Sequence, residues 1–306
     1  MTTPRHIVIS DDAHELPYSK GVMAGAIMAT GLAPARAFHV AELIEERLHT
    51  AGITALTRAE LQEQARVVLR DEVGERYAAS FANWQRVHEL GRPLVILIGG
   101  ATGVGKSTIA TQLAARLGIT RVIPTDAIRE VMRAMLSDDM LPALHASSFD
   151  TDRLVLKPVP SNADPVVIGY REQAAAVAVG IKALVRRAIM EGTDLILEGA
   201  HIAPGFVDLD ELEGAVVVSF LVTVDDEELH RSHFVRRAHD ARGRPMDRYL
   251  EHFDHIRTIH RYVASLARDH GMPIVPSYSL DATLAQVIEL VLSRALAAVP
   301  SPQPVS

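Results

Sequence analysis

The sequence contains no cysteine, which excludes disulfide bonds, thiolate zinc sites, iron–sulfur clusters and cysteine nucleophiles at once. It also lacks a long hydrophobic run. The most apolar stretch, residues 93–100, is far too short to span a bilayer, and the first residues lack the apolar centre of a signal peptide. We therefore expect a cytoplasmic protein without a membrane partner.

Positive charge is scarce as well. Lysine and arginine together number 31 against 38 aspartates and glutamates, so the formal net charge is −7. No basic field covers the whole chain, which argues against nucleic acid as a partner and means that any anion site must be local. The 306 residues, 48% of them hydrophobic, are enough for two globular domains with their own cores.

The first 90 residues predict a small, mostly helical domain. A short strand-like run at 6–9 is followed by helical patterns, and Thr57 and Glu60 have the spacing of a capping box. Gly91-Arg92-Pro93 then breaks the pattern, so we place the domain boundary there. The expected helices cover residues 19–31, 34–50, 57–73 and 75–90.

Residues 91–298 predict an α/β domain, because apolar strand candidates alternate with helical stretches. Such alternation is typical of one doubly wound, five-stranded parallel sheet. The Pro/Ser/Asp-rich stretch 137–168 is too long for an idle connection and is a candidate substrate-binding insertion, while 299–306 is expected to be a flexible tail. The strand candidates are 94–98, 121–123, 194–197, 215–224 and 273–275.

A phosphate-binding loop follows the first of these strands. The run from Gly100 to Ser107 matches G-x-x-x-x-G-K-[ST] and leads into a helical pattern, which is the context this motif requires. Lys106 should reach the terminal phosphates of a nucleotide and Ser107 should ligate Mg²⁺. The predicted ATP-binding residues are Gly100, Ala101, Thr102, Gly103, Val104, Gly105, Lys106, Ser107 and Thr108.

Asp126 follows the second strand candidate and should lie at the ligand-binding end of the sheet, because open α/β sheets bind ligands beyond the carboxyl ends of their strands. There it can orient or deprotonate an acceptor hydroxyl. Arg129 and Arg133 are four residues apart on one helix face, where forked donors suit an anionic acceptor. The alternative is a plain helix cap followed by solvated arginines.

Glu198 ends the third strand candidate beside the expected nucleotide site, where it would act through Mg²⁺ or its water. The alternative is a structural bond to the phosphate loop. His201, three residues later, is by itself as consistent with a packed loop histidine as with a ligand.

Arginines cluster again between 231 and 261, on either side of a Gly-Arg-Pro break. Two helices broken at such a point are typical of a hinged lid that brings arginines onto transferring phosphates and excludes water. A solvated helical hairpin or an RNA-facing patch are the alternatives, and the lack of interleaved aromatics counts against RNA. The candidate catalytic lid residues are Arg236, Arg237, Arg242 and Arg244.

Taken together these motifs resemble the P-loop kinase family of 2-phosphoglycerate kinase, whose members make 2,3-bisphosphoglycerate from 2-phosphoglycerate and ATP. The resemblance covers nearly the whole chain. It implies that His145, Ser147 and Ser148, within the insertion, contact the acceptor, and we group His201 with them. It rests on 17–21, 100–107, 125–133, 145–149, 169–173, 198–201 with 204–205, and 248–257.

The first 90 residues resemble an ATP-cone, a small helical nucleotide-sensing domain. Such domains carry a basic pair before an Asp-Gly turn, whereas this chain has Asp11 and Asp12 there. Acid in that place argues against a second nucleotide site. The alternatives are packing against the kinase core or mediating assembly, so a homo-oligomer is a further possibility.

The sequence thus predicts a P-loop kinase that uses ATP and Mg²⁺ and a small anionic acceptor, with 2-phosphoglycerate expected first. One alternative is a kinase for another phosphorylated or polyol acceptor, such as an inositol phosphate. Another is a nucleotide-sensing module without turnover. A sensor has no need of Asp126 or of the Arg129 and Arg133 pair, which favours an enzyme.

Overall fold

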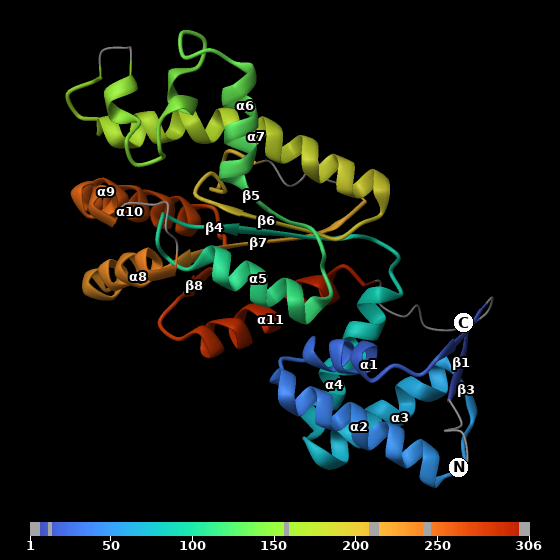
Figure 1. The fold of residues 1–306 in the computed structure, drawn as a ribbon. Helices are drawn as coiled ribbons and strands as arrows, with labels where there is room; N and C mark the ends of the chain where they lie inside the picture. Colours follow the sequence, from blue (N-terminus) through green and yellow to red (C-terminus); the bar gives the residue numbers. More distant parts are fainter. Residues whose placement is uncertain (1–6, 12–13, 156–158, 208–213, 241–245, 300–306) are drawn as a thin grey trace. The chain divides into compact units, whose positions relative to one another are not determined.

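A computed structural model describes residues 7–11, 14–155, 159–207, 214–240 and 246–299. The chain forms two compact units, which are described separately (Figure 1). The first comprises residues 1–91 with 115–118 and 288–306, and the second comprises 92–114 and 119–287. Of the predicted tail, residues 300–306 lie outside the described residues. In the part of the chain that is described, no helix has the length and apolar character needed to cross a membrane.

The first unit combines the four predicted helices with a small sheet of three strands. β1 (Val8–Asp11) pairs antiparallel with β2 (His14–Pro17) and parallel with β3 (Ala55–Thr57). The predicted strand at 6–9 overlaps β1, whereas β2 and β3 were not predicted. β3 has only three residues, with a single buried side chain, so it leaves no periodic signal. The helices are α1 (Lys20–Met28), α2 (Pro34–Thr50), α3 (Arg58–Glu72) and α4 (Glu75–His88).

The capping box at the start of α3 is present. The Thr57 hydroxyl accepts a hydrogen bond from the Glu60 backbone N–H at 3.2 Å, and a Glu60 carboxylate oxygen accepts one from the Thr57 N–H at 2.7 Å. The two bonds satisfy donors that the first turn of a helix leaves unpaired. They fix the point at which β3 ends and α3 begins.

The second unit is built on a parallel sheet of five strands in the order β5-β6-β4-β7-β8, which confirms the predicted fold class. Each predicted strand overlaps an observed one. The central strand β4 is buried along its whole length, because its sequence LVILIG has no polar side chain to turn outward. The strands are β4 (Leu94–Gly99), β5 (Val122–Pro124), β6 (Leu195–Gly199), β7 (Val216–Thr223) and β8 (Ile274–Pro276).

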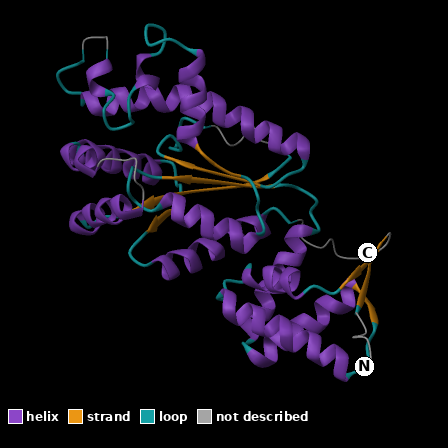
Figure 2. Cartoon of the chain, in the orientation of Figure 1, coloured by secondary structure: helices purple, strands orange, loops and turns teal. Residues whose placement is uncertain are grey.

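Helices cover both faces of this sheet, as Figures 1 and 2 show. α6 (Thr125–Met135) and α7 (Pro165–Glu191) lie on one face, and α5 (Lys106–Leu117) and the start of α11 (Leu280–Ala297) on the other. The strand arrows point toward the end where α8 (Glu227–Asp240), α9 (Met246–Glu251) and α10 (Phe253–Asp269) gather. This end is therefore the expected ligand-binding edge.

The strand order reverses at β4, which has β6 on one side and β7 on the other. The chain leaves β4 toward β5 and leaves the neighbouring strand β6 in the opposite direction, toward β7, so a crevice opens beyond the carboxyl ends of these two strands. The glycine-rich loop begins there, directly after Gly99. The fold thus places the phosphate-binding motif at the switch point of the sheet.

The insertion is folded rather than loose. It contains two short 3₁₀ turns, η1 (Pro142–His145) and η2 (Asp152–Leu154), and buries Leu144, Phe149 and Asp150. It ends earlier than predicted, because α7 begins at Pro165. Proline is tolerated at a first helical position, and the Asp164 carboxylate caps the helix by accepting from the Val166 N–H at 2.8 Å.

Candidate active site

The loop after β4 takes a path that glycine makes possible. Gly100, Gly103 and Gly105 have φ angles of +141°, +88° and +94°, in the region that residues with a side chain rarely adopt. A Cβ on Gly100 would lie 2.5 Å from the Val222 carbonyl oxygen. The loop runs directly into α5, whose first N–H groups have no partner within the helix. This backbone fits a nucleotide polyphosphate.

Lys106 and Ser107 open α5 and reach in two directions. The Lys106 Nζ donates to the Ala101 carbonyl oxygen at 2.7 Å, across the loop. The Ser107 hydroxyl donates to a Glu198 carboxylate oxygen at 2.8 Å. Glu198 is buried near the end of β6, in register with Ile98 of β4 and Pro124 of β5. A hydroxyl and a carboxylate oxygen held together fit a hard cation such as Mg²⁺.

A cavity of about 950 Å³ lies over this loop and extends to the insertion. It brings together the P-loop, the carboxyl ends of β5 and β6, the start of α6 and residues of α8 and α9. Its walls include Thr102, Gly103, Gly105, Lys106, Ser107, Thr108, Asp126, Arg129, Glu130, Ser147, Ser148, Phe149, Glu198, His233, Arg248 and Tyr249. Gly100, Ala101 and Val104, also predicted to bind ATP, do not line it, and Ala101 and Val104 are buried in the loop.

Asp126 lines the cavity from the first turn of α6. The residue that caps this helix is Pro124, so Asp126 is not the N-cap. Desolvation acts to raise the pKa of Asp126, but the opposing effects of His201, Arg129 and Lys106 are together larger and hold this pKa below its ordinary value. The carboxylate is therefore ionised at neutral pH and able to accept a hydrogen bond from a hydroxyl group.

Arg129 connects α6 to the insertion. Its Nη1 donates to the carbonyl oxygens of Leu144 at 2.8 Å and Ala146 at 3.1 Å, while its Nε lies 3.5 Å from an Asp126 carboxylate oxygen. Most of its donors are thus used within the protein. Arg129 still contributes to the cavity wall, as a cation that holds Asp126 and the start of the Ser147 segment.

Two other predicted acceptor ligands do not line the cavity. Arg133 is half-exposed on α6 and pairs with Glu130, its Nη2 lying 2.7 Å from a carboxylate oxygen. His145 forms a hydrogen bond between Nε2 and the Leu136 carbonyl oxygen at 3.0 Å. Ser147 and Ser148, in contrast, reach the wall. The 3₁₀ turn η1 ends at His145, so consecutive side chains there do not share one direction.

His201 is fully buried beneath the cavity and cannot touch a molecule inside it. The Gln173 amide nitrogen donates to the carbonyl oxygens of Ala143 and Ala146, so the Gln173 amide oxygen is left to accept from His201 Nε2 at 3.0 Å. His201 Nδ1 must then accept from the Thr125 hydroxyl at 2.8 Å. Burial lowers the pKa of His201 to about 4, in keeping with this neutral form. The chain of bonds joins the first residue of α6 to the insertion.

Residues of α8 that the sequence analysis missed contact the phosphate loop. His230 Nε2 lies 2.8 Å from the Thr102 carbonyl oxygen and His233 Nδ1 lies 2.9 Å from that of Gly103. Phe234 packs so closely that a Cβ on Gly103 would lie 2.3 Å from its ring. The spacing of these three residues, on one helix face, is the signal that could have found them.

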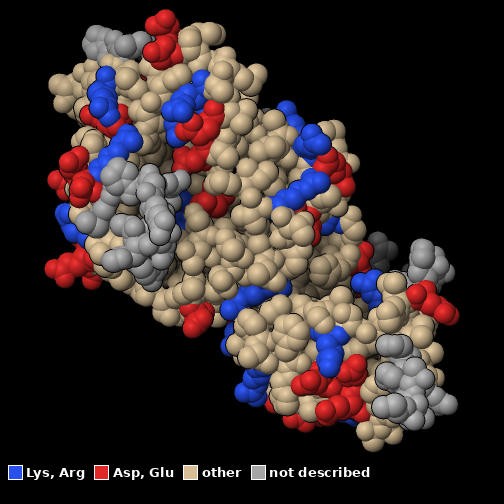
Figure 3. Space-filling model, viewed as in Figure 1, with Lys and Arg blue, Asp and Glu red and all other residues tan. Residues whose placement is uncertain are grey.

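Only part of the predicted lid falls within the described residues. Arg236 and Arg237 lie in α8, on the helix that contacts the P-loop, but their side chains are outside the description. Arg242 and Arg244 lie outside the described residues. On the face seen in Figure 3, positive and negative side chains are interspersed over the second unit, so the described residues form no surface of a single sign there.

No family model matches the chain. A protein named 2-phosphoglycerate kinase from Methanopyrus kandleri is 38% identical over 95% of this chain and 89% of its own length. Proteins of the same name from Methanothermobacter thermautotrophicus and Thermococcus kodakarensis are 38% and 35% identical, over 92% of this chain and 92% and 96% of theirs. A solved structure, a putative kinase from Chloroflexus aurantiacus, covers 65% of this chain with a TM-score of 0.34 and 15% identity. A TM-score this low does not show a shared fold, so the fold class is assigned from the sheet topology.

Proposed function

The chain belongs to the 2-phosphoglycerate kinase family, and on this premise we propose that it transfers the γ-phosphoryl group of ATP to the free hydroxyl of 2-phosphoglycerate. The products are ADP and 2,3-bisphosphoglycerate. The observation that carries the proposal is one cavity in which the phosphate loop and the Ser107–Glu198 pair face Asp126 and the Ser147–Ser148 segment.

On the nucleotide side, the glycine-rich backbone and the start of α5 bind the polyphosphate, and Lys106 places its charge at the terminal phosphates. Ser107 and Glu198 would hold Mg²⁺, directly or through water. When bound, the metal neutralises charge on the phosphate oxygens.

On the acceptor side, Asp126 orients the hydroxyl group. Its ionised carboxylate accepts the hydroxyl hydrogen bond, and the hydroxyl oxygen attacks the γ-phosphorus as the bond to the bridging oxygen of ADP breaks. The hydroxyl proton passes to Asp126 and from there to solvent. Lys106 and the P-loop donors stabilise the charge that develops on the transferring group.

The two domains and the lid complete the proposal. We propose a P-loop kinase domain at 91–298 and an ATP-cone-like domain at 1–90. Arg236, Arg237, Arg242 and Arg244 belong to the proposed lid, which is supported by the contacts that His230 and His233 of α8 make with the phosphate loop. We keep Arg133 and His145 as candidates that would need a change of conformation to reach an acceptor.

The experiment that tests this function measures ADP release from Mg·ATP over a small panel of acceptors. The panel contains 2-phosphoglycerate, 3-phosphoglycerate, glycerate and inositol phosphates. Strong stimulation by 2-phosphoglycerate alone supports the proposal. Stimulation by an inositol phosphate instead would move the assignment to that acceptor, and ATP binding without any stimulation would favour a nucleotide sensor.

Changing Glu198 to Gln should increase the demand for Mg²⁺. The amide keeps the volume and one oxygen but removes the charge that fixes the Ser107 hydroxyl. We expect the apparent Mg²⁺ constant to rise ~10- to 100-fold, the range found when a partner of a metal ligand is removed. A Mg²⁺ titration of ADP release at saturating ATP measures this. An unchanged Mg²⁺ constant would show that Glu198 only bonds the phosphate loop.

A further inference from the structure

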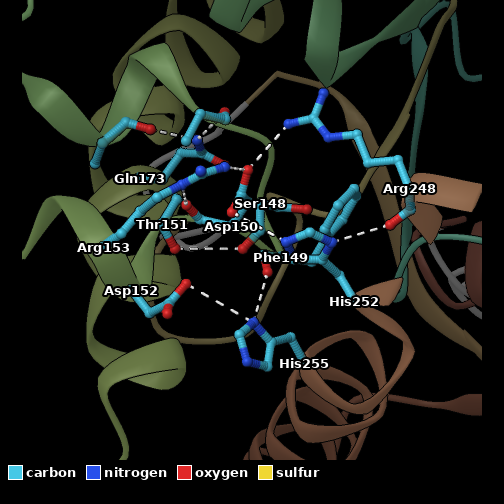
Figure 4. A network of polar contacts seen from close by, with 12 residues as sticks. Ser148, Phe149, Asp150, Thr151, Asp152, Arg153, Gln173, Arg248, His252 and His255 are labelled. Atoms are coloured by element: carbon cyan, nitrogen blue, oxygen red, sulfur yellow. Dashed lines mark hydrogen bonds and ion pairs between the residues drawn. The ribbon is translucent and has the colours of Figure 1, made fainter. Parts of the chain in front are cut away.

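A buried carboxylate joins the insertion to the helices that follow the lid. The Asp150 side chain is 4% exposed, and its two oxygens lie within ion-pair distance of three basic residues. One oxygen lies 3.0 Å from Arg248 Nη2 and is also paired with Arg153, while the other lies 3.3 Å from His252 Nε2. Figure 4 shows Arg153 approaching from the insertion and Arg248 and His252 from the opposite side.

Arg248 faces the cavity with most of its guanidinium unused. It lines the same cavity as Ser147 and Ser148, and its side chain is 47% exposed. Its carbon Cζ lies 5.8 Å from the centre of the Phe149 ring, and Phe149 in turn packs against Tyr249 with 5.6 Å between ring centres. Among the residues that the structure describes, Asp150 is its one hydrogen-bond partner, through Nη2.

The charges around Asp150 are unequal. One carboxylate serves two guanidinium groups, those of Arg153 and Arg248, so a positive charge is left over. Arg153 is not part of the cavity wall, whereas Arg248 is. The unneutralised charge thus lies on the wall of the cavity that Ser147 and Ser148 also line. Guanidinium and hydroxyl donors that line one cavity suit the oxygens of a phosphate group.

We propose that Arg248, with Ser147 and Ser148, binds the phosphate group that the acceptor already carries, and that Asp150 is the positioning residue that aims the guanidinium. This inference rests on the proposed function and assigns residues to its acceptor. The phosphate bound here is distinct from the one transferred, which belongs to the P-loop. The arrangement selects phosphorylated acceptors over glycerate, because glycerate leaves Arg248 without a partner.

The test compares steady-state constants for 2-phosphoglycerate and for Mg·ATP in four single variants and one double variant. Arg248→Ala should raise the KM for 2-phosphoglycerate ~10- to 100-fold, the size expected for a charge-assisted bidentate contact, and leave the KM for ATP unchanged. Arg248→Lys should restore part of this, because an ammonium group keeps the charge but not the fork. Arg153→Ala is the matched control, since it removes a cation from the same carboxylate without changing the cavity wall.

Asp150→Asn separates positioning from mere stability. If Asp150 acts through Arg248, Asp150→Asn raises the KM for 2-phosphoglycerate alone, and adding it to Arg248→Ala causes no further rise. Additive losses would overturn the positioning role. An unchanged KM for 2-phosphoglycerate in Arg248→Ala and Arg248→Lys, or equal rises for ATP and acceptor, would overturn the ligand role.

The proposed function fails on a different observation. If the unsubstituted protein is not stimulated by 2-phosphoglycerate, both the function and the acceptor named here are overturned. If the unsubstituted protein is stimulated and both Arg248→Ala and Arg248→Lys, shown to be folded by thermal unfolding, keep the same KM for 2-phosphoglycerate, only the inference is overturned. The two failures are therefore distinguishable in one set of assays.

Discussion

Lys106→Ala should lose at least ~10²-fold in kcat, the loss that follows when one preorganised charge donor is removed from a reacting centre. Lys106 is 8% exposed, and its Nζ donates to the Ala101 carbonyl oxygen at 2.7 Å, so water in the alanine variant can only partly take over the role of the ammonium group. The ammonium group is thus already in place before the phosphoryl group moves. Initial rates of ADP release at saturating 2-phosphoglycerate and ATP measure the effect.

A lysine elsewhere in the same unit provides the control. Lys182 lies in α7 and does not line the cavity, so Lys182→Ala should keep the kcat of the unsubstituted protein. Thermal unfolding of both variants shows whether a loss of activity is a loss of folded protein. A Lys106→Ala protein that folds and turns over normally would remove Lys106 from the proposed mechanism.

Asp126→Asn should lower kcat by ~10²- to 10⁴-fold, the range for a residue that accepts a proton in the transition state. The amide keeps the shape of the side chain but cannot take the proton. The KM for ATP should change little, because Asp126 belongs to α6 and not to the phosphate loop. The measurement is a pair of saturation curves, one for each substrate, analysed for kcat and KM separately.

The pH dependence gives a second readout of Asp126. His201, Arg129 and Lys106 together hold its pKa below the ordinary value of 3.8, so the carboxylate stays ionised as the pH falls from neutral toward 5. We therefore expect no loss of kcat over that interval from protonation of Asp126.

Asp139→Asn, on the exposed loop after α6, is the matched control for Asp126→Asn. Normal kinetics in Asp126→Asn together with a lower melting temperature would assign Asp126 a structural role.

The acceptor side of the cavity depends on a buried polar layer beneath it. His201 and Gln173 carry hydrogen bonds from Thr125, the neighbour of Asp126, to the carbonyl oxygens of the insertion. Arg129 donates to the Ala146 carbonyl oxygen that Gln173 also contacts. Asp126 and Ser147 are thus held relative to each other by His201 and Gln173, which do not line the cavity, and by Arg129, which does.

The sequence predicted the features whose cause is local. The P-loop is a contiguous motif of eight residues. Its glycines set the path of the backbone, and its lysine and serine follow directly, so no distant residue is needed to recognise it. The five strands of the second unit were found because buried parallel strands are short, continuous apolar runs. Asp126 and Glu198 followed from the rule that ligands bind beyond the carboxyl ends of such strands.

Helix spacing was less informative, because it identifies a face but not its neighbour. Arg129 and Arg133 share one face of α6, yet Arg129 is held by the insertion while Arg133 pairs with Glu130. The same limit hid His230 and His233, whose partners are carbonyl oxygens of the phosphate loop about 130 residues earlier in the chain. What a helix face contacts is set by packing, which the sequence of the helix does not contain.

Thus the sequence by itself determined the fold class, the phosphate loop and the strand-end carboxylates, because each depends on residues that are adjacent or periodic in the chain. The tertiary structure decided which side chains share the cavity. Asp150 and Arg248 are 98 residues apart and meet only because the insertion and α9 fold against each other. Tertiary packing also decided that His201 does not line the cavity. The residue is buried, and both of its ring nitrogens have partners inside the protein.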